Sequence, residues 1–389
     1  MYSEEDLNSA VAAGALSAEA AASFRAHMTK QRELPRGSEE NFRLINSFND
    51  IFVAIGIVIL LLAMGAVGQA LASAVVDVPR PDWSSLPPSQ AEEQAWRDTW
   101  ELRQALQFCF AGALVAAAAW PLAEFFTRRR RMALPSILLL LAFVGGTFFT
   151  IFGLGQAILL DGNDRIGALL ISAATLVAAG GAYVHWRRFM VPITVAAGTA
   201  AIAGTAISLI LAALGPDSLS QEVVLPLVFV TGLGVFAFAM RWDMSDPERV
   251  TRQSDVAFWL HLLAAPMIAH PVFALIGVTD NDGVGIVGAI GVLAVYVAFG
   301  LVALAIDRRA LLVSALAYVL FALTFLFREF GAVELNFALT ALVIGSALLS
   351  LSAFWQPIRR AVVMALPANL RAKLPATEDP VIPNAARPA

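Results

Sequence analysis

Residues 51–76 read IFVAIGIVILLLAMGAVGQALASAVV, and this stretch decides the fold. None of its residues is charged. An α-helix rises 1.5 Å per residue, so about 20 apolar residues cross the hydrocarbon core of a bilayer, which is about 30 Å thick. The stretch therefore predicts a transmembrane helix.

Nine further stretches of the same kind follow along the chain, separated by polar segments. Together they predict an all-α, polytopic transmembrane helix bundle of about ten spans. The ten predicted spans are residues 51–76, 105–126, 134–160, 166–186, 190–214, 224–240, 256–278, 284–305, 310–327 and 333–355.

The composition supports a membrane protein. Of 389 residues, 59% are hydrophobic and only 14% are charged, with a mean hydropathy of +0.73. A soluble surface needs about a quarter of its residues charged, so lipid is expected to be the main solvent. The net charge of -4 gives no electrostatic case for binding nucleic acid. The single cysteine, Cys109, rules out an intrachain disulfide and a cysteine-rich metal site.

Basic residues alternate between the loops in a way that predicts orientation. Loops retained in the cytoplasm are enriched in Lys and Arg. The expected cytoplasmic segments are 25–43, 128–131, 187–188, 241–252, 308–309 and 359–373, and those between them are poorer in basic residues. Both termini are therefore predicted to be cytoplasmic. No apolar h-region follows a basic start, so the first span is expected to serve as the internal signal and anchor.

Three regions are predicted from this pattern. Residues 1–48 form a cytoplasmic helical hairpin segment, with Ser3 and Ser17 as helix caps and Gly14 ending the first helix. Residues 49–356 form the transmembrane bundle. Residues 357–389 form an amphipathic and then disordered cytoplasmic tail, with the amphipathic helix broken at Pro367. Trp355 and four other tryptophans near span ends are expected to anchor at the lipid headgroups.

A two-helix hairpin repeat is one reading of the internal similarities. Gly68-Gln69-Ala70-Leu71 in the first span matches Gly155-Gln156-Ala157-Ile158 in the third. Arg130-Arg131-Met132 likewise resembles Arg187-Arg188-Phe189-Met190, with Asp307-Arg308-Arg309 after the eighth span. The alternative is that any multi-pass protein with basic cytoplasmic loops shows such pairs. Both readings stay open.

Polar side chains inside spans are the candidates for function, because they are costly in lipid. His261 and His270 lie in the seventh span, but a separation of nine residues points them to opposite faces of a straight helix, so they cannot share one metal ion. A structural role between helices, with Pro266 and Pro271 kinking the backbone, competes with a proton-relay or ligand-binding role; haem ligation lacks a second pair on another span. His270 is the better candidate of the two. No cofactor is expected.

Gln69 and Gln156 are the next candidates for ligand binding. An amide in the outer third of a span either hydrogen-bonds another helix or lines a wet cavity. The sequence has no Walker loop, no G-x-S-x-G and no H-E-x-x-H motif, so a non-enzymatic protein is expected.

The segment Gly14-Ala15-Leu16-Ser17-Ala18-Glu19-Ala20-Ala21, with the Gly-Gln pattern of the first and third spans, carries a resemblance. It resembles uncharacterised bacterial multi-pass membrane proteins of a domain-of-unknown-function family, which carry a short N-terminal helical segment of the type G-x-[IL]-S-x-E-x-A. The resemblance covers the first third of the chain. It implies the cytoplasmic (inner) membrane of a bacterium as the location, with both termini inside, and it implies no activity and no site residue.

Three functional hypotheses follow. The first is an inner-membrane protein that binds or transports a small or lipid-like molecule. The second is a structural or sensory partner protein that docks another chain through the N-terminal segment or the 77–103 loop. The third is a carrier similar to drug/metabolite exporters, which also have ten spans.

Overall fold

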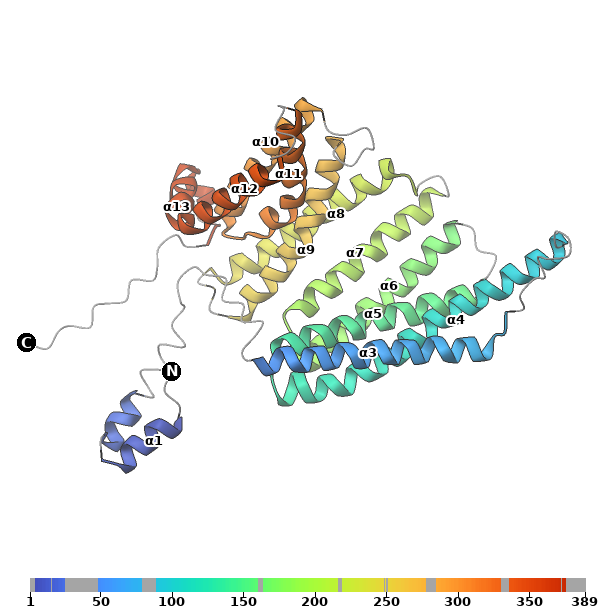
Figure 1. Ribbon diagram of the computed structural model, residues 1–389, viewed down its shortest axis with the longest axis horizontal. Helices are drawn as coiled ribbons and strands as arrows, with labels where there is room; N and C mark the ends of the chain where they lie inside the picture. Colours follow the sequence, from blue (N-terminus) through green and yellow to red (C-terminus); the bar gives the residue numbers. More distant parts are fainter. Residues whose placement is uncertain are drawn as a thin grey trace, which may run out of the picture.

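A computed structural model describes residues 4–14, 16–24, 48–78, 89–159, 164–215, 219–247, 249, 251–277, 285–329, 336–371 and 373–375. Every regular element within these ranges is a helix, which confirms the predicted all-α fold (Figure 1). Nine of the described helices are long and apolar enough to cross a membrane, and a bent pair makes up to ten. The nine are α3 (Phe48–Val75), α4 (Gln90–Ala123), α5 (Ala133–Ile158), α6 (Asp164–Phe189), α7 (Ile193–Leu214), α8 (Gln221–Ser245), α9 (Arg252–Leu275), α10 (Ile286–Ile306) and α11 (Ala310–Glu329).

The bent pair replaces the tenth predicted span. Helix α12 (Asn336–Ala353) stops at Phe354, and α13 (Trp355–Ala365) leaves it at an angle of 75°. The predicted amphipathic helix after the spans is α13, and it ends before Pro367, since proline cannot continue a helix. A last turn, α14 (Ala368–Arg371), follows. The tail predicted to be disordered lies beyond the described residues from position 376 onward.

Helix α4 is longer than its predicted span because a charged segment extends it. Ser89 caps the helix in a capping box with Glu92. The helix runs on through Pro121 into a π-helical stretch, η1 (Glu124–Arg129). The charged residues ahead of position 105, predicted to lead into the second span, are therefore the first turns of the same helix.

The N-terminal segment is helical where it is described. Helix α1 (Glu4–Ala12) ends at Gly14, whose φ of +71° suits a glycine, and residues 18–24 form a second helix. The Ser17 hydroxyl accepts a hydrogen bond from the Ala20 amide, as expected of a cap. Ser3, the other predicted cap, lies outside the described residues. The domain boundaries and the cytoplasmic placement of this segment stay predictions.

The membrane helices form hairpins set side by side in a row (Figure 1). The four hairpins are α4 with α5, α6 with α7, α8 with α9, and α10 with α11, each joined by a basic turn, and α3 packs closely on α4. Neighbouring hairpins contact each other mainly through α5 with α6, α7 with α9, and α9 with α11. Of all spans, α9 is the most buried. We call the end of the bundle that carries these four turns the arginine end.

Each turn at the arginine end contains one non-glycine residue in the left-handed region. These residues are Arg131, Met190, Arg249 and Asp307, with φ between 53° and 57°, and they recur every 58 or 59 residues. The left-handed conformation costs a non-glycine residue about 1–2 kcal/mol. Its recurrence at regular intervals supports the two-helix repeat, with the unit centred on the basic turn.

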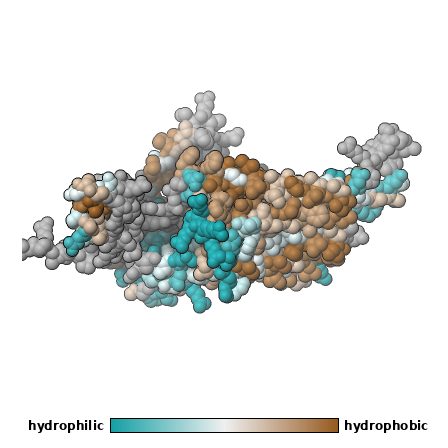
Figure 2. All heavy atoms as spheres, turned by 90° about the horizontal axis from the view of Figure 1, so that it is seen from below, coloured by the Kyte–Doolittle hydropathy of each residue, from teal (hydrophilic) through white to brown (hydrophobic). Residues whose placement is uncertain are grey.

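Glycines let α3, α4 and α5 approach closely. A Cβ added at Gly68 would lie 2.4 Å from the backbone nitrogen of Ala111, and one at Gly112 would lie 2.6 Å from the carbonyl oxygen of Gly146. Such contacts drive helix association where lipid removes the hydrophobic effect. Large apolar side chains cover much of the outer surface (Figure 2), as expected of a membrane protein.

Candidate functional site

A buried ion cluster joins two hairpins at the arginine end. The Arg308 guanidinium, in the turn between α10 and α11, donates to Asp243 Oδ1 at 2.6 Å. It also donates to the carbonyl oxygen of Ser254, at 3.1 Å, and to its hydroxyl, at 3.3 Å. The Asp243 and Arg308 side chains are only 2% and 3% exposed. Burying two charges is costly, so this pair must be well satisfied to persist.

His261 completes this cluster from α9. Its Nε2 lies 2.8 Å from Asp243 Oδ2, and its ring meets Phe236 edge to face. Within the described part of the chain, its buried Nδ1 has no hydrogen-bond partner. A neutral ring that donates through Nε2 leaves Nδ1 without a proton, which suits a nitrogen with no acceptor beside it. The packing therefore favours neutral His261 next to an Asp–Arg pair.

Asp307 forms a second cluster beside the first. Its left-handed backbone lets the carboxylate accept from Arg249 at 2.9 Å and from the indole Nε1 of Trp355 at 2.7 Å. Burial lowers the pKa of Arg249, and the charge of Asp307 opposes that shift. Arg359 lies 3.6 Å from Asp307 and donates to the carbonyl oxygen of Pro375. These bonds hold α13 against the turn.

The prediction that Trp355 anchors at the lipid headgroups is therefore wrong. Its side chain is buried, and its indole hydrogen-bonds to a carboxylate instead of facing lipid headgroups. The cause is the 75° bend after α12, which turns the helix start into the bundle. The exposed Arg309 lies over the Trp355 ring at 4.7 Å.

Gln69 and Gln156 lie at the opposite end of the helices, in two grooves on either side of α4. The α4–α5 groove, of about 430 Å³, is lined by Gln69, Gln104, Gln107 and Phe108 and by residues further along α4 and α5. The α4–α6 groove, of about 350 Å³, contains Gln156 and Glu101. Gln104 and Phe108 line both grooves, so the two share one wall.

Polarity changes along the α4–α5 groove. Its amides gather near Gln104, and its lining becomes apolar toward Val115 and Leu141. The distance along α4 from Gln104 to Val115 is about 16 Å, from the helical rise. The backbone contact between Gly112 and Gly146 closes its floor, and Gly145 faces open space, because a Cβ there would meet nothing within 4 Å. An amphipathic molecule would match this gradient.

His270 lies apart from both places. It is exposed, and its Nδ1 lies 2.7 Å from the hydroxyl of Tyr318 on α11. The Tyr318 ring stacks on Phe273 with centroids 4.4 Å apart. His261 points to α8 and His270 to α11, in keeping with the helical geometry expected for a separation of nine residues. The structure does not bring His270 together with the other three candidates.

Sequence reasoning missed Asp243, Arg308 and Gln104. Arg308 was assigned only to the basic-loop pattern, and the sixth span was predicted to stop at position 240, ahead of Asp243, whereas α8 continues to Ser245. An acidic residue within a helical turn or two of a basic turn was the available signal.

Within the described ranges, no group of three or more His, Cys, Asp and Glu side chains could hold a metal ion. Comparisons of the chain with family models, with curated proteins and with solved structures gave no match. The resemblance to bacterial multi-pass proteins through the N-terminal segment therefore stays a prediction.

Proposed function

We propose that this membrane protein binds a lipid-like amphipathic molecule with an uncharged, hydrogen-bonding head in the α4–α5 groove. The observation that carries the proposal is the polarity gradient of the groove, from the glutamine amides at one end to Val115 and Leu141 at the other. Amides both donate and accept hydrogen bonds without charge. An apolar chain would lie along the remainder of the groove.

The surroundings of the groove support an uncharged head. The nearby Arg103 guanidinium donates to the Ser73 hydroxyl at 3.0 Å and is thereby engaged within the protein. The amide of Gln107 donates to the same hydroxyl at 3.2 Å. Gln104 and Gln69 are exposed and offer their amides to a ligand.

Binding rather than catalysis is the activity proposed, in the cytoplasmic membrane of a bacterium with both termini inside. Movement of the ligand across the membrane is a further hypothesis, and so are the exporter-like carrier and the docking of a partner chain. None of these is needed to explain the groove.

A pair of glycine variants tests the proposal. Gly145→Leu fills the α4–α5 groove without a backbone clash, and Gly180→Leu adds the same side chain to an exposed face of α6, where a Cβ also meets open space. The purified, delipidated chain is titrated with monoolein, and the complex is followed by native mass spectrometry. We expect Gly145→Leu to lose the complex and Gly180→Leu to keep it. Equal occupancy in the two variants would refute the proposal.

A second pair tests the head of the ligand. Gln104→Leu removes the amide shared by both grooves, whereas Gln94→Leu makes the same change on α4 outside them, where Gln94 bonds to Asp98. Weaker monoolein binding is expected for Gln104→Leu alone. If both variants bind monoolein as the unaltered protein does, the amides do not recognise the head.

A further inference from the structure

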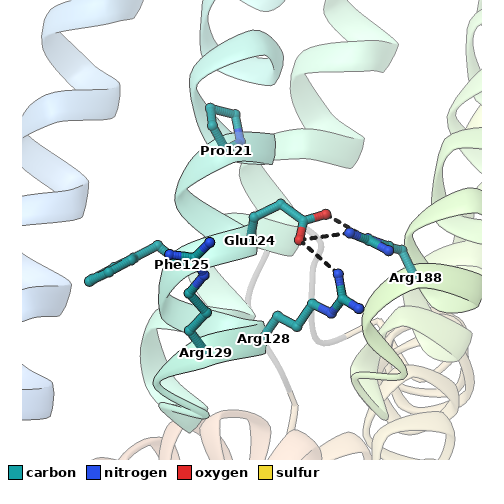
Figure 3. Close-up of a pocket in the computed structure, with 6 residues that line it drawn as sticks. All are labelled: Pro121, Glu124, Phe125, Arg128, Arg129 and Arg188. Atoms are coloured by element: carbon teal, nitrogen blue, oxygen red, sulfur yellow. Dashed lines mark hydrogen bonds and ion pairs between the residues drawn. The ribbon is translucent and has the colours of Figure 1, made fainter.

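The π-helical stretch η1 lines a pocket at the arginine end, separate from the two grooves described above. The pocket measures about 650 Å³ and lies between η1 and the end of α6 (Figure 3). Its lining is Pro121, Glu124, Phe125, Arg128, Arg129 and Arg188. A π-helical turn widens a helix by one residue and is found often at functional sites.

Charge in this pocket is strongly unbalanced. Glu124 is its one acidic residue, and the guanidinium groups of Arg128 and Arg188 point to it, whereas that of Arg129 lies on the other side, beside Phe125 (Figure 3). Arg188 holds Glu124 through two hydrogen bonds, of 2.6 and 3.0 Å, and Arg128 lies 3.5 Å from the same carboxylate (Figure 3). Arg129 forms no ion pair within the described part of the chain. The lining therefore carries an excess of two positive charges.

The pairing of Glu124 with Arg188 shows which kind of anion the arginines of the pocket bind. The carboxylate oxygens accept from the two nitrogens of one guanidinium, the fork geometry that also binds a phosphate. The groups remain open to solvent, because Glu124 is 31% exposed and Arg188 is 42% exposed. An external anion with two or more oxygens can thus reach the arginines without burying a charge.

Apolar surface adjoins the charged groups. Pro121 and Phe125 are exposed and line the pocket. On α6, the exposed side chain of Val184 lies one turn from Arg188. A small inorganic anion would leave this surface uncovered, whereas a lipid would place its chains on it. Basic pockets between transmembrane helices recognise anionic headgroups in this way.

We propose that this pocket binds the phosphodiester headgroup of an anionic phospholipid, with Arg128 and Arg188 on the phosphate, Arg129 adding positive charge beside Phe125, and the acyl chains against Phe125 and Pro121. Glu124 holds two of these arginines in place while competing with the phosphate for them. This site is separate from the α4–α5 groove, and either can fail without the other.

The test uses the full chain in a detergent that retains lipid, titrated with phosphatidylglycerol and read by native mass spectrometry. Arg129→Gln is compared with Arg187→Gln, which removes the same charge from a residue outside the pocket that donates to the Tyr183 hydroxyl. One arginine near an anionic lipid accounts for about a fivefold change in affinity. We expect Arg129→Gln to weaken the one-to-one complex at least that much more than Arg187→Gln does.

Glu124→Gln gives a result of opposite sign. Removing the competing carboxylate frees Arg128 and Arg188, so phosphatidylglycerol should bind more tightly, whereas a purely structural ion pair predicts no gain. Equal weakening by Arg129→Gln and Arg187→Gln would overturn the proposal in favour of general charge attraction. Parallel titrations with phosphatidylcholine and with inorganic phosphate identify the source: a match to phosphatidylglycerol by either would overturn an anionic lipid as the ligand.

Discussion

Replacing Asp243 by leucine removes the carboxylate on which the buried cluster at the arginine end depends. Arg308 would keep its bonds to Ser254 but lose the carboxylate to which it donates at 2.6 Å, and His261 would lose the acceptor of its Nε2 proton. Both partners are almost fully buried, so water cannot replace the lost carboxylate without opening the bundle. The perturbation therefore removes a buried charge partner of Arg308 that water cannot replace.

The magnitude follows from that burial. Removing one partner of a buried ion pair costs about 3–5 kcal/mol, because the other charge remains desolvated. Arg308→Met should cost a similar amount. In the double variant Asp243→Leu/Arg308→Met no charge is stranded, and only polar groups of Ser254 and His261 lose partners, at about 1–3 kcal/mol each. The double variant should therefore cost about 2–6 kcal/mol, less than the roughly 6–10 kcal/mol that two independent single variants would cost together.

The assay is a double-mutant cycle on the free energy of unfolding in mixed micelles with a rising fraction of sodium dodecyl sulfate. Arg309→Met is the control, since Arg309 is the neighbouring arginine but is exposed and rests on the Trp355 ring. Its loss should cost about 0.5–1 kcal/mol. If the losses of unfolding free energy in the two single variants add up to the loss in the double variant within about 0.5 kcal/mol, Asp243 and Arg308 do not form a coupled, buried pair.

Three further predictions use the same measurement of unfolding free energy. Gly112→Ala should destabilise by about 1–3 kcal/mol, because its Cβ would lie 2.6 Å from an α5 carbonyl oxygen, whereas Gly145→Ala, which meets open space, should not; equal costs would contradict the close packing. Trp355→Phe should cost about 1.5–3 kcal/mol by removing the hydrogen bond to the Asp307 carboxylate, and a change below 0.5 kcal/mol, on the order of an ordinary surface substitution, would contradict it. Met190→Gly should stabilise by up to about 1 kcal/mol through relief of the left-handed backbone, and a clear loss of stability would argue against that strain.

Local sequence was enough to predict the spans. Each apolar stretch carries its own signal, since a helix in lipid satisfies its backbone hydrogen bonds internally. The predicted eighth span, 284–305, and ninth span, 310–327, match α10 (Ile286–Ile306) and α11 (Ala310–Glu329) to within a few residues. The prediction of the tenth span was less accurate, because the hydropathy of a stretch does not indicate where its helix bends, as it does after α12.

The ion clusters could not be predicted in the same way. Asp243 lies in a charged segment that ends the hydropathy signal of its span, so it was left outside the predicted span. Its partner Arg308 follows 65 residues later, and no local pattern pairs the two. His261 was recognised as costly in lipid, but its partner remained unknown. The carboxylate that explains it comes from another helix.

The residues that line the grooves were likewise predicted only in part. Gln69 and Gln156 were found because an amide is conspicuous among apolar residues. Gln104 was not singled out, since it stands at the end of a charged stretch of α4, yet it is the amide that both grooves share. Which amides lie near one another depends on the glycine-mediated approach of neighbouring helices, which is a property of packing and not of any single span.

Two of the long-range ion pairs follow one design, and each joins neighbouring hairpins. Glu124 near the end of α4 pairs with Arg188 at the next turn, and Asp243 near the end of α8 pairs with Arg308 at the next turn, over 64 and 65 residues. The second hairpin, α6 with α7, has no acid at the equivalent position, six or seven residues before its left-handed residue. Tyr183 and its apolar neighbour lie there instead. This hairpin contacts the third through the packing of α7 on α9. An acid on one hairpin and an arginine on the next thus hold repeated units together. The sequences of these units differ, but the left-handed backbone of their turns is the same.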